Sequence, residues 1–185
     1  VEEYRKEKYE RFESGELMSM DSLELPDSLK YSTRITGRTV YGGGGILPDV
    51  FVPLDTTDNS AYFSSILRKG LDSRFALTYV DSLRAQLETT YPTEEDFVDQ
   101  FNVDAAMASD FQKFLTTEGI EWDEEGWERS GDAITLRLKA MIGRNLVQPS
   151  TFYRVISGLN ESLQKAVTIL EDGTFEQSNL AHDTF

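Results

Sequence analysis

Hydrophobic residues recur at spacings of three and four along most of the chain after Asn59. This spacing places side chains on one face of an α-helix, so it predicts a series of amphipathic helices, each with one buried side. The predicted stripes are Tyr62, Phe63, Ile66 and Leu67; Phe75, Tyr79, Leu83 and Leu87; Phe97, Val98 and Phe101; Met107, Phe111, Phe114 and Leu115; Ile134, Leu138, Met141, Ile142 and Leu146; Phe152, Val155, Ile156 and Leu159; and Leu163, Ala166, Val167 and Leu170.

Prolines and capping residues predict where several of these helices begin and end. Pro92 disfavours helix at the residue before it and therefore ends the second stripe. Thr93 with a carboxylate three residues later, Asp96, has the pattern of a capping box that opens the next helix. Pro149 stops the long stripe before it, and we expect Ser150 to cap the helix that follows.

The first third of the chain has a different pattern, in which hydrophobic and polar residues alternate in short runs. Tyr31, Thr33 and Ile35 alternate with polar neighbours, Gly37 interrupts the run, and 39–41 resumes it. β-Branched and aromatic residues interrupted by glycine predict a strand, a turn and a strand.

The segments around this predicted hairpin are less regular. We expect a short helix over 2–13 and an extended connector over 18–29. The four glycines at 42–45 must leave any regular strand, because they cost backbone entropy and pack nothing. The run 46–53 predicts a further extended segment whose prolines place it at an edge or an end. The polar stretch after Glu171 is expected to be a loosely held tail.

These patterns predict an α+β fold that is mostly α. A small β element, a strand-turn-strand with a Gly-rich loop, precedes a bundle of about five or six short helices. We divide the chain into a β and connector segment at 1–58, a helical domain at 59–170 and a tail at 171–185. Because the chain begins at Val1 rather than at Met, we expect it to be a segment or a processed product of a longer protein.

Charge and cysteine content exclude several classes of function. The net charge is −15, and the stretch from Gln86 to Asp132 holds 14 Asp and Glu residues against Lys113 and Arg129. Such a surface repels phosphate, so it disfavours binding to nucleic acid and to anionic lipid. There are no cysteines, which excludes disulfides, thiolate nucleophiles and cysteine metal sites.

The usual catalytic and binding constellations are weak in this chain, so we assign no catalytic residue, no cofactor site and no metal site. The sole histidine, His182, lies near the C-terminus, where a triad base would lack rigid neighbours. The lysines lie in polar or amphipathic contexts rather than in the desolvated setting that a Ser-Lys dyad requires. The four glycines lack the Gly-Lys-Ser/Thr ending of a phosphate-binding loop.

One acidic cluster keeps two interpretations open. Glu121, Asp123, Glu124, Glu125 and Glu128 surround Trp122 and Trp127. The carboxylates suit Ca²⁺, but the alternating loop of an EF-hand is missing. The alternative is a helix start, where carboxylates are favourable at the positive end of the helix dipole, with the tryptophans anchoring the segment on the core.

The stretch from Thr36 to Asp55 resembles a signature of the carboxy-terminal processing, or tail-specific, serine proteases. In that family a Gly-Arg pair is followed by Gly-Ile, any residue, Pro-Asp and an apolar strand, and a tyrosine before four glycines resembles the Bacteroidetes-type variant. The segments 15–17, 27–31, 142–144 and 158–160 also look like that variant. The signature residues, to which we assign structural roles, are Gly37, Arg38, Tyr41, Gly42, Gly43, Gly44, Gly45, Ile46, Pro48, Asp49 and Pro53.

The resemblance implies an exported endopeptidase that recognises the C-terminal tails of protein substrates. In that family a PDZ domain captures the tail and a Ser-Lys dyad cleaves nearby, and both precede the signature. Neither the serine motif nor the lysine motif appears here, so the resemblance implies a non-catalytic C-terminal portion in the cell envelope or periplasm. The implied partners are the catalytic core and PDZ domain of the parent, its protein substrates and further copies of the protein.

Two other functions compete with this interpretation. The chain could form a free-standing helical module whose acidic face binds a basic protein. It could also be an enzyme in its own right, since acidic residues are abundant, although nothing singles out two of them as a catalytic pair. Salt sensitivity of binding separates the first of these from an accessory role.

Overall fold

A computed structural model describes Lys6, Gly15, Ser19 and the ranges 27–35, 37, 39–42, 48–55 and 57–177. The fold is α+β and mostly α, as predicted, with one small antiparallel sheet among the described residues. Contacts divide the chain into two compact units. We call Thr56–Asn160 the helical unit, and Val1–Asp55 together with Glu161–Phe185 the split unit, because two separate stretches form it.

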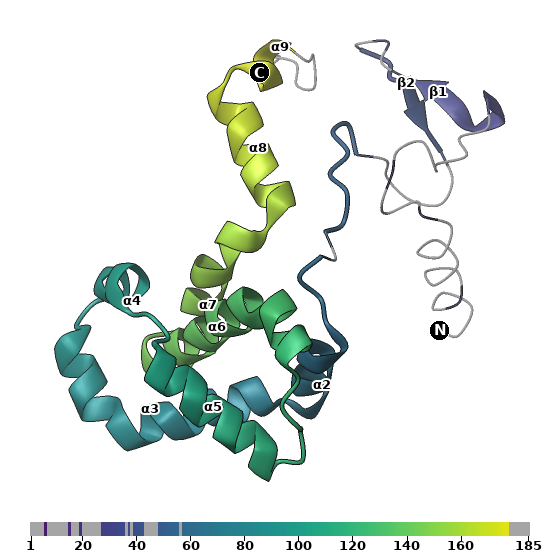
Figure 1. The fold of residues 1–185 in the computed structure, drawn as a ribbon. Helices are drawn as coiled ribbons and strands as arrows, with labels where there is room; N and C mark the ends of the chain where they lie inside the picture. The colour runs from purple at the N-terminus through teal and green to yellow at the C-terminus, as the bar shows by residue number, and fades with distance from the viewer. Residues whose placement is uncertain are drawn as a thin grey trace. The chain divides into compact units, whose positions relative to one another are not determined.

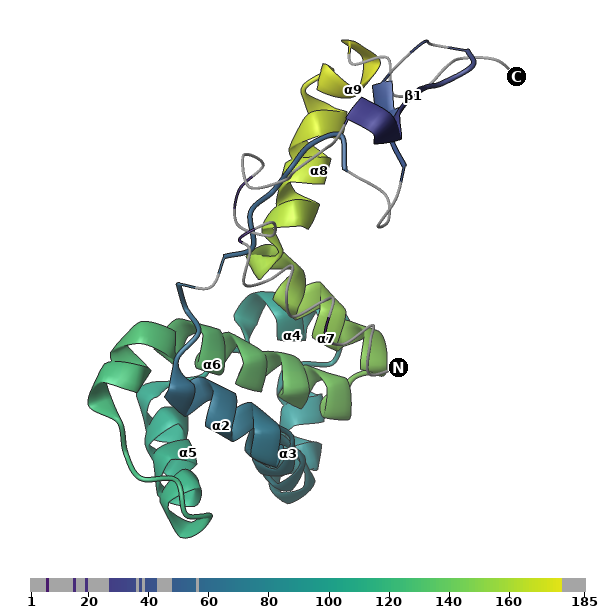
Figure 2. The same ribbon diagram turned by 90° about the vertical axis from the view of Figure 1, so that its right-hand side faces the viewer.

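The helical unit is built around its longest helix, α6. Its elements are α2 (Ala61–Lys69), α3 (Leu71–Thr90), α4 (Glu94–Gln100), α5 (Ala105–Thr117), α6 (Glu124–Leu146), α7 (Pro149–Ile156) and the 3-10 turn η3 (Ser157–Leu159). α6 packs against α3, α7, α2 and α4 (Figures 1 and 2). With 20 and 23 residues, α3 and α6 are longer than the short helices that we expected.

Local chemistry explains where these helices begin. Thr93 and Asp96 form the predicted capping box, in which each side chain accepts a hydrogen bond from the other residue's backbone N–H. Ser60 caps α2 by accepting from the N–H of Phe63. Gly70 joins α2 to α3 in the left-handed region at φ 64°, where a side chain would be strained.

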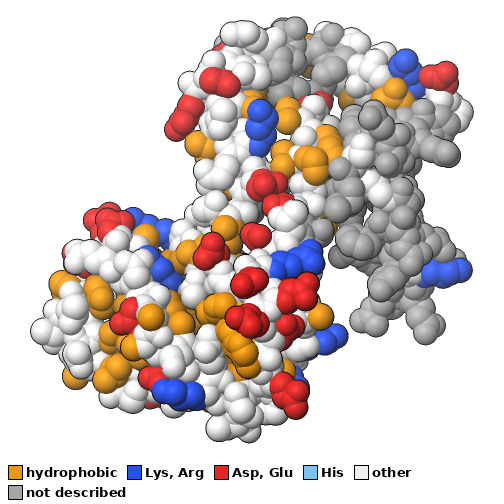
Figure 3. Space-filling model, in the orientation of Figure 1, with side chains coloured by type: hydrophobic (Ala, Val, Ile, Leu, Met, Phe, Trp, Pro, Cys, Tyr) orange, Lys and Arg blue, Asp and Glu red, His pale blue; other side chains and the backbone are white. Residues whose placement is uncertain are grey.

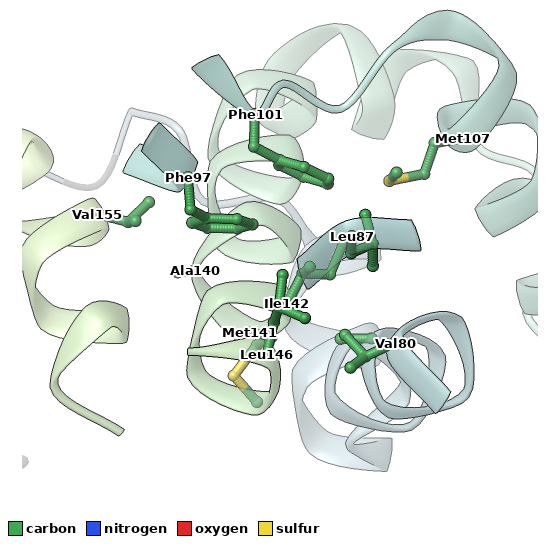
Figure 4. Packing of buried hydrophobic residues seen from close by; sticks show 11 residues of the cluster. Val80, Leu87, Phe97, Phe101, Met107, Ala140, Met141, Ile142, Leu146 and Val155 are labelled. Atoms are coloured by element: carbon green, nitrogen blue, oxygen red, sulfur yellow. The ribbon is translucent and has the colours of Figure 1, made fainter. Parts of the chain in front are cut away.

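The predicted stripes supply the core of the helical unit. One buried cluster lies between α3, α4, α6 and α7, with the Phe97 and Phe101 rings stacked at a centroid distance of 4.7 Å (Figure 4). A second cluster joins α2, α5 and α6 through buried residues such as Ile66, Phe111 and Leu138. These positions confirm the buried faces predicted within the helical unit. The stripe predicted at 163–170 is wrong as a buried face, because Leu163, Val167 and Leu170 are exposed.

The start of α7 differs from our prediction. Ser150 is not the cap, because Gln148 occupies that position and Pro149 is the first helical residue. Proline is favourable there, since its missing N–H would have no partner in the first turn. The inward face is also shorter than expected: Val155 is buried, whereas Leu159 is 51% exposed beyond the end of the helix.

The split unit contains the predicted hairpin. β1 (Lys30–Ser32) pairs antiparallel with β2 (Thr39–Tyr41), with Tyr31 opposite Val40. A 3-10 turn, η2 (Asp27–Leu29), precedes β1, so the end of the expected extended connector is helical instead. Residues 48–53 form bends and coil rather than a paired strand, because Pro48 and Pro53 cannot donate to a ladder.

The rest of the split unit is helical where it is described. α8 (Glu161–Glu171) follows η3 after the predicted break at Gly158 and Asn160. A short helix, α9 (Thr174–Gln177), occupies part of what we expected to be an irregular tail. The predicted helix at 2–13 lies outside the described residues except for Lys6, which is helical.

Candidate functional site

The hairpin brings together two stretches that carry the family resemblance, 27–31 and 39–42. The N–H of Gly42 donates to the carbonyl of Leu29 over 2.8 Å, which extends the pairing beyond β2. The Tyr31 ring lies directly over Gly42: a Cβ at position 42 would be 2.8 Å from Tyr31 Cε2. A side chain at position 42 would displace this exposed ring, so the first glycine of the four-glycine run allows the ring to lie close to the backbone of the hairpin.

The turn of the hairpin depends on a second signature glycine. Gly37 has φ +67°, and its N–H donates to the carbonyl of Thr33 over 3.1 Å. A residue with a side chain is strained in this conformation, which explains why glycine stands between the two strands. Tyr41 is the last residue of β2 and is half-buried.

The other signature residues lie either in coil or outside the described residues. Pro48, Asp49 and Pro53 are exposed in the coil that follows the glycines. The remaining signature residues, Arg38, Gly43, Gly44, Gly45 and Ile46, lie outside the described residues. The structural roles that we assigned to Arg38 and Asp49 therefore stay predictions.

The acidic cluster is the beginning of α6. Asp123 is the N-cap and accepts a hydrogen bond from the N–H of Gly126 over 2.9 Å, as the helix-start interpretation predicts. Burial, with Asp123 adding to it, raises the pKa of the Tyr62 hydroxyl to about 12. In the part of the chain that the structure describes, no group of His, Cys, Asp and Glu side chains has an arrangement that could hold a metal ion.

The two tryptophans of this segment play different parts. Trp127 is half-buried against the second core cluster and so anchors α6, as expected. Trp122 keeps 45% of its surface exposed while its ring meets Tyr62 edge-on at 6.0 Å. Acidic side chains are frequent on the face of the helical unit seen in Figure 3.

One lysine is less exposed than its amphipathic context predicted. Lys139 is half-buried on α6, and burial lowers the pKa of its ammonium, while Asp99 acts in the opposite direction. Its Nζ donates to the carbonyl of Val98 over 2.6 Å, in the last turn of α4. A cation there satisfies a free carbonyl at the negative end of the helix dipole, which is a structural role.

Three sets of polar interactions join distant elements of the helical unit and were not predicted from the sequence; we call each of them a tie. Ser130, buried on α6, donates to the carbonyl of Asp58 over 2.6 Å and accepts from the N–H of Ser60 over 3.0 Å. Arg137 Nε donates to buried Asp72 over 2.6 Å. These two ties join residues at least 65 positions apart, so no local pattern could have revealed them.

The third tie links α4 to α7. The Glu94 carboxylate accepts from Thr151 Oγ1 over 2.6 Å and from Arg154 Nη1 over 3.0 Å. Hydrogen bonds from Thr151 and then Gln148, together with Arg154, lower the pKa of the Glu94 carboxyl. The carboxylate thereby joins the first turn of α4 to α7 through side-chain hydrogen bonds and an ion pair.

Comparison with known proteins places one part of the chain in context. Residues 62–148 are similar to a family of unknown function, DUF8443. This match lies wholly within the helical unit and runs from the second residue of α2 to the N-cap of α7. No curated protein and no solved structure matches the chain. Within the described residues, none of the helices combines the length and hydrophobicity that a transmembrane segment needs.

Proposed function

We propose that this chain is the non-catalytic C-terminal portion of a carboxy-terminal processing serine endopeptidase. In this proposal the parent protein cleaves protein substrates near their C-terminal tails with a Ser-Lys dyad that precedes Val1. The chain adds the hairpin to the edge of the protease core and carries the helical unit as an accessory domain. The cell envelope or periplasm is the compartment that the family resemblance implies.

The observation that carries this proposal is the exposure of the hairpin. Every residue of β1 is exposed, and Tyr31 keeps 57% of its surface accessible. A hairpin of two strands is only marginally stable in water, and its outer edges carry backbone groups that pair readily with another strand. A hairpin with this signature is therefore well suited to completing a larger sheet.

The helical unit is suited to a different task, because it has a core of its own. Substrate access, oligomerisation and partner docking are the accessory tasks that we consider for it. Its match to a family model that leaves out the hairpin supports the view that it is a separate module.

The proposal is tested by assaying cleavage of an unstructured peptide. We would compare this chain, the longer protein that contains it, and that longer protein with its candidate serine replaced by alanine. We expect cleavage by the longer protein only. Cleavage by this chain alone, abolished by replacing one of its own residues, would show that the chain has its own active site and would overturn the proposal.

A second candidate function rests on the segment around Trp122. Five exposed carboxylates and a half-exposed tryptophan suit a partner with Lys or Arg side chains, through charge attraction and cation–π contact. Binding of this kind weakens as the salt concentration rises, because salt screens the attraction between the charges. Pull-downs of basic proteins that are unaffected by ionic strength would count against this function.

A further inference from the structure

Tyr62 on α2 has a hydroxyl without a hydrogen-bond partner in the part of the chain that the structure describes. The residue is only 5% exposed, and its hydroxyl makes no hydrogen bond to the protein. Every side-chain nitrogen or oxygen atom that is fully buried among the described residues does have a partner, so the Tyr62 hydroxyl reaches the surface. Because a buried tyrosine usually hydrogen-bonds through its hydroxyl, this one points to a ligand.

The surroundings of Tyr62 are aromatic and acidic. The Trp122 ring, which is 45% exposed, meets the Tyr62 ring edge-on at a centroid distance of 6.0 Å, and the Trp127 ring lies 5.4 Å from that of Trp122. Burial and then the charge of Asp123 raise the pKa of the Tyr62 hydroxyl to about 12, so the carboxylate lies near the hydroxyl. An accessible indole, a hydroxyl and a carboxylate therefore come together where α6 begins.

The carboxylates of this region are not neutralised by the protein. All five of those at 121–128 are exposed, and none of them forms an ion pair with a described residue. Carboxylates elsewhere in the helical unit do pair, as Glu118 does with Arg74 at 2.8 Å. Arg129, the nearest cation in the sequence, donates from its Nε to the carbonyl of Thr57 over 2.7 Å. The uncompensated charge favours a cation supplied by a partner.

Two kinds of cation fit this arrangement poorly. The described acidic side chains have no arrangement that could hold a metal ion. A quaternary ammonium needs a cage of rings around it, whereas Trp122 lies against both Tyr62 and Trp127 and leaves no space between the rings. Such an ammonium also has no N–H to donate to the hydroxyl of Tyr62.

A guanidinium group meets every requirement of the site. It is planar and stacks on aromatic rings, and its five N–H donors allow contact with a hydroxyl and a carboxylate at the same time. A lysine ammonium is more strongly hydrated and does not stack in this way. The chemistry of the site therefore favours arginine over lysine.

We infer that Tyr62, Trp122 and Asp123 form a recognition site for an arginine side chain of a basic protein. The guanidinium stacks on the Trp122 ring, donates to Tyr62 Oη and pairs with the Asp123 carboxylate, while the neighbouring carboxylates steer the partner toward the site. This inference rests on the second candidate function and names the side chain that anchors the basic partner. It does not depend on the protease proposal.

Binding of two short peptides to the full chain tests the site. Acetylated and amidated Gly-Ser-Arg-Ser-Gly and Gly-Ser-Lys-Ser-Gly have the same charge, and the indole N–H signals of the two tryptophans in NMR spectra report binding. We expect the arginine peptide to bind about threefold to tenfold more tightly than the lysine peptide. It should shift the signal of Trp122 more than that of Trp127.

Matched variants separate the site from the general acidity of the chain. Tyr62→Phe keeps the ring and should weaken binding of the arginine peptide by about threefold to tenfold, whereas Tyr153→Phe removes an exposed hydroxyl from α7 and should not. Asp123→Asn keeps a side chain that caps α6 and should also weaken binding. Asp81→Asn removes the same charge from α3 and should have little effect.

Two outcomes would overturn the inference, and they differ in what they mean for the second candidate function. Equal binding of both peptides, weakened by salt but not by Tyr62→Phe, would retain that function as diffuse charge attraction and reject the arginine site. Binding of neither peptide would reject both. If circular dichroism shows that Tyr62→Phe does not fold, Trp122→Ala at the exposed ring takes its place and is expected to weaken binding by about fivefold.

Discussion

Single residues in the helical unit show how closely its helices approach one another. Gly143 on α6 faces Phe97 of α4 and Thr151 of α7, and a Cβ at this position would lie 2.6 Å from Phe97 Cε1 and 2.8 Å from Thr151 Cγ2. Both neighbours are fully buried, so neither can move away into solvent. The glycine therefore sets the distance between α6 and the two helices that cover it.

Gly143→Ala is expected to lower the free energy of unfolding by about 1–3 kcal/mol, the usual cost of an extra methyl group in a packed core. Gly158→Ala is the matched control, because a Cβ there meets nothing within 4 Å. The measurement is urea unfolding followed by circular dichroism. Equal midpoints for the two variants would contradict the close approach at Gly143.

Burial also decides how much an ion pair contributes to the stability of the fold. Asp72 is 6% exposed and pairs with Arg137 at 2.6 Å, whereas Asp81 is exposed and pairs with Arg84 at 3.5 Å. Asp72→Ala should cost about 2–3 kcal/mol, less than for a fully buried pair, since the Arg137 side chain keeps 27% exposure. Asp81→Ala should change the unfolding free energy by less than about 0.5 kcal/mol. Thermal unfolding of both variants tests the contrast.

The sequence predicted the burial of some of these residues but not of others. Periodicity identified Phe97 and Ile142 as buried, because a helix face is a local pattern. It could not identify Ser130 or Asp72 as buried, since their partners are far away in the sequence. The partial burial of Lys139 was not predicted, for the same reason. Its ammonium donates to a carbonyl in the last turn of α4, and the position of α4 cannot be read from the residues around Lys139.

At the scale of elements, short α4 is held by charged side chains at both ends. The Glu94 carboxylate ties its first turn to α7, and Lys139 donates to the carbonyl of Val98 in its last turn. Between these ties, Phe97 inserts into the core. α4 was predictable as an element from its capping box, but its attachment to α7 and α6 was not.

The hydrogen bonds and ion pair of Glu94 predict how the stability of the fold depends on pH. The folded state lowers the pKa of this carboxyl below the ordinary 4.5, so its stabilising contribution is complete above that value. The contribution is lost as the pH falls through the lower pKa of the folded state. Glu94→Gln should therefore flatten the fall in stability between about pH 5 and about pH 2.

Glu95→Gln is the control for this experiment, because Glu95 is 77% exposed and its nearest Arg154 nitrogen is 3.8 Å away. Its pH profile should match that of the unmodified chain. The measurement is chemical denaturation at a series of pH values. A Glu94→Gln profile that also matches the unmodified chain would contradict the role of the tie.

At the scale of the whole molecule, the two units differ in what stabilises them. The helical unit contains both hydrophobic clusters, whereas no described residue of the split unit is buried. Sequence patterns predicted the hairpin and the helices, but not that the chain returns to its first unit after α7. That return depends on contacts between segments more than 100 residues apart, which periodicity does not report.

This difference predicts that the helical unit folds alone. Residues 56–160 expressed by themselves should keep their helical circular dichroism and unfold cooperatively on heating, because both clusters lie within them. A peptide of residues 27–55 should show no stable strand signal, since two strands without a partner sheet are marginal. Non-cooperative unfolding of 56–160 would mean that the helical unit depends on the split unit.

The interruption of the split unit also has a consequence for protein synthesis. After the ribosome has made Asp55, it must add the 105 residues of the helical unit before the first residue of α8 appears. At about 5–20 residues per second this takes about 5–20 s, long enough for the helical unit to fold first. During that interval the split unit lacks α8, so a nascent chain stalled within the helical unit would carry the hairpin, with its outer strand edges unpaired, without the helix that follows it in the same unit.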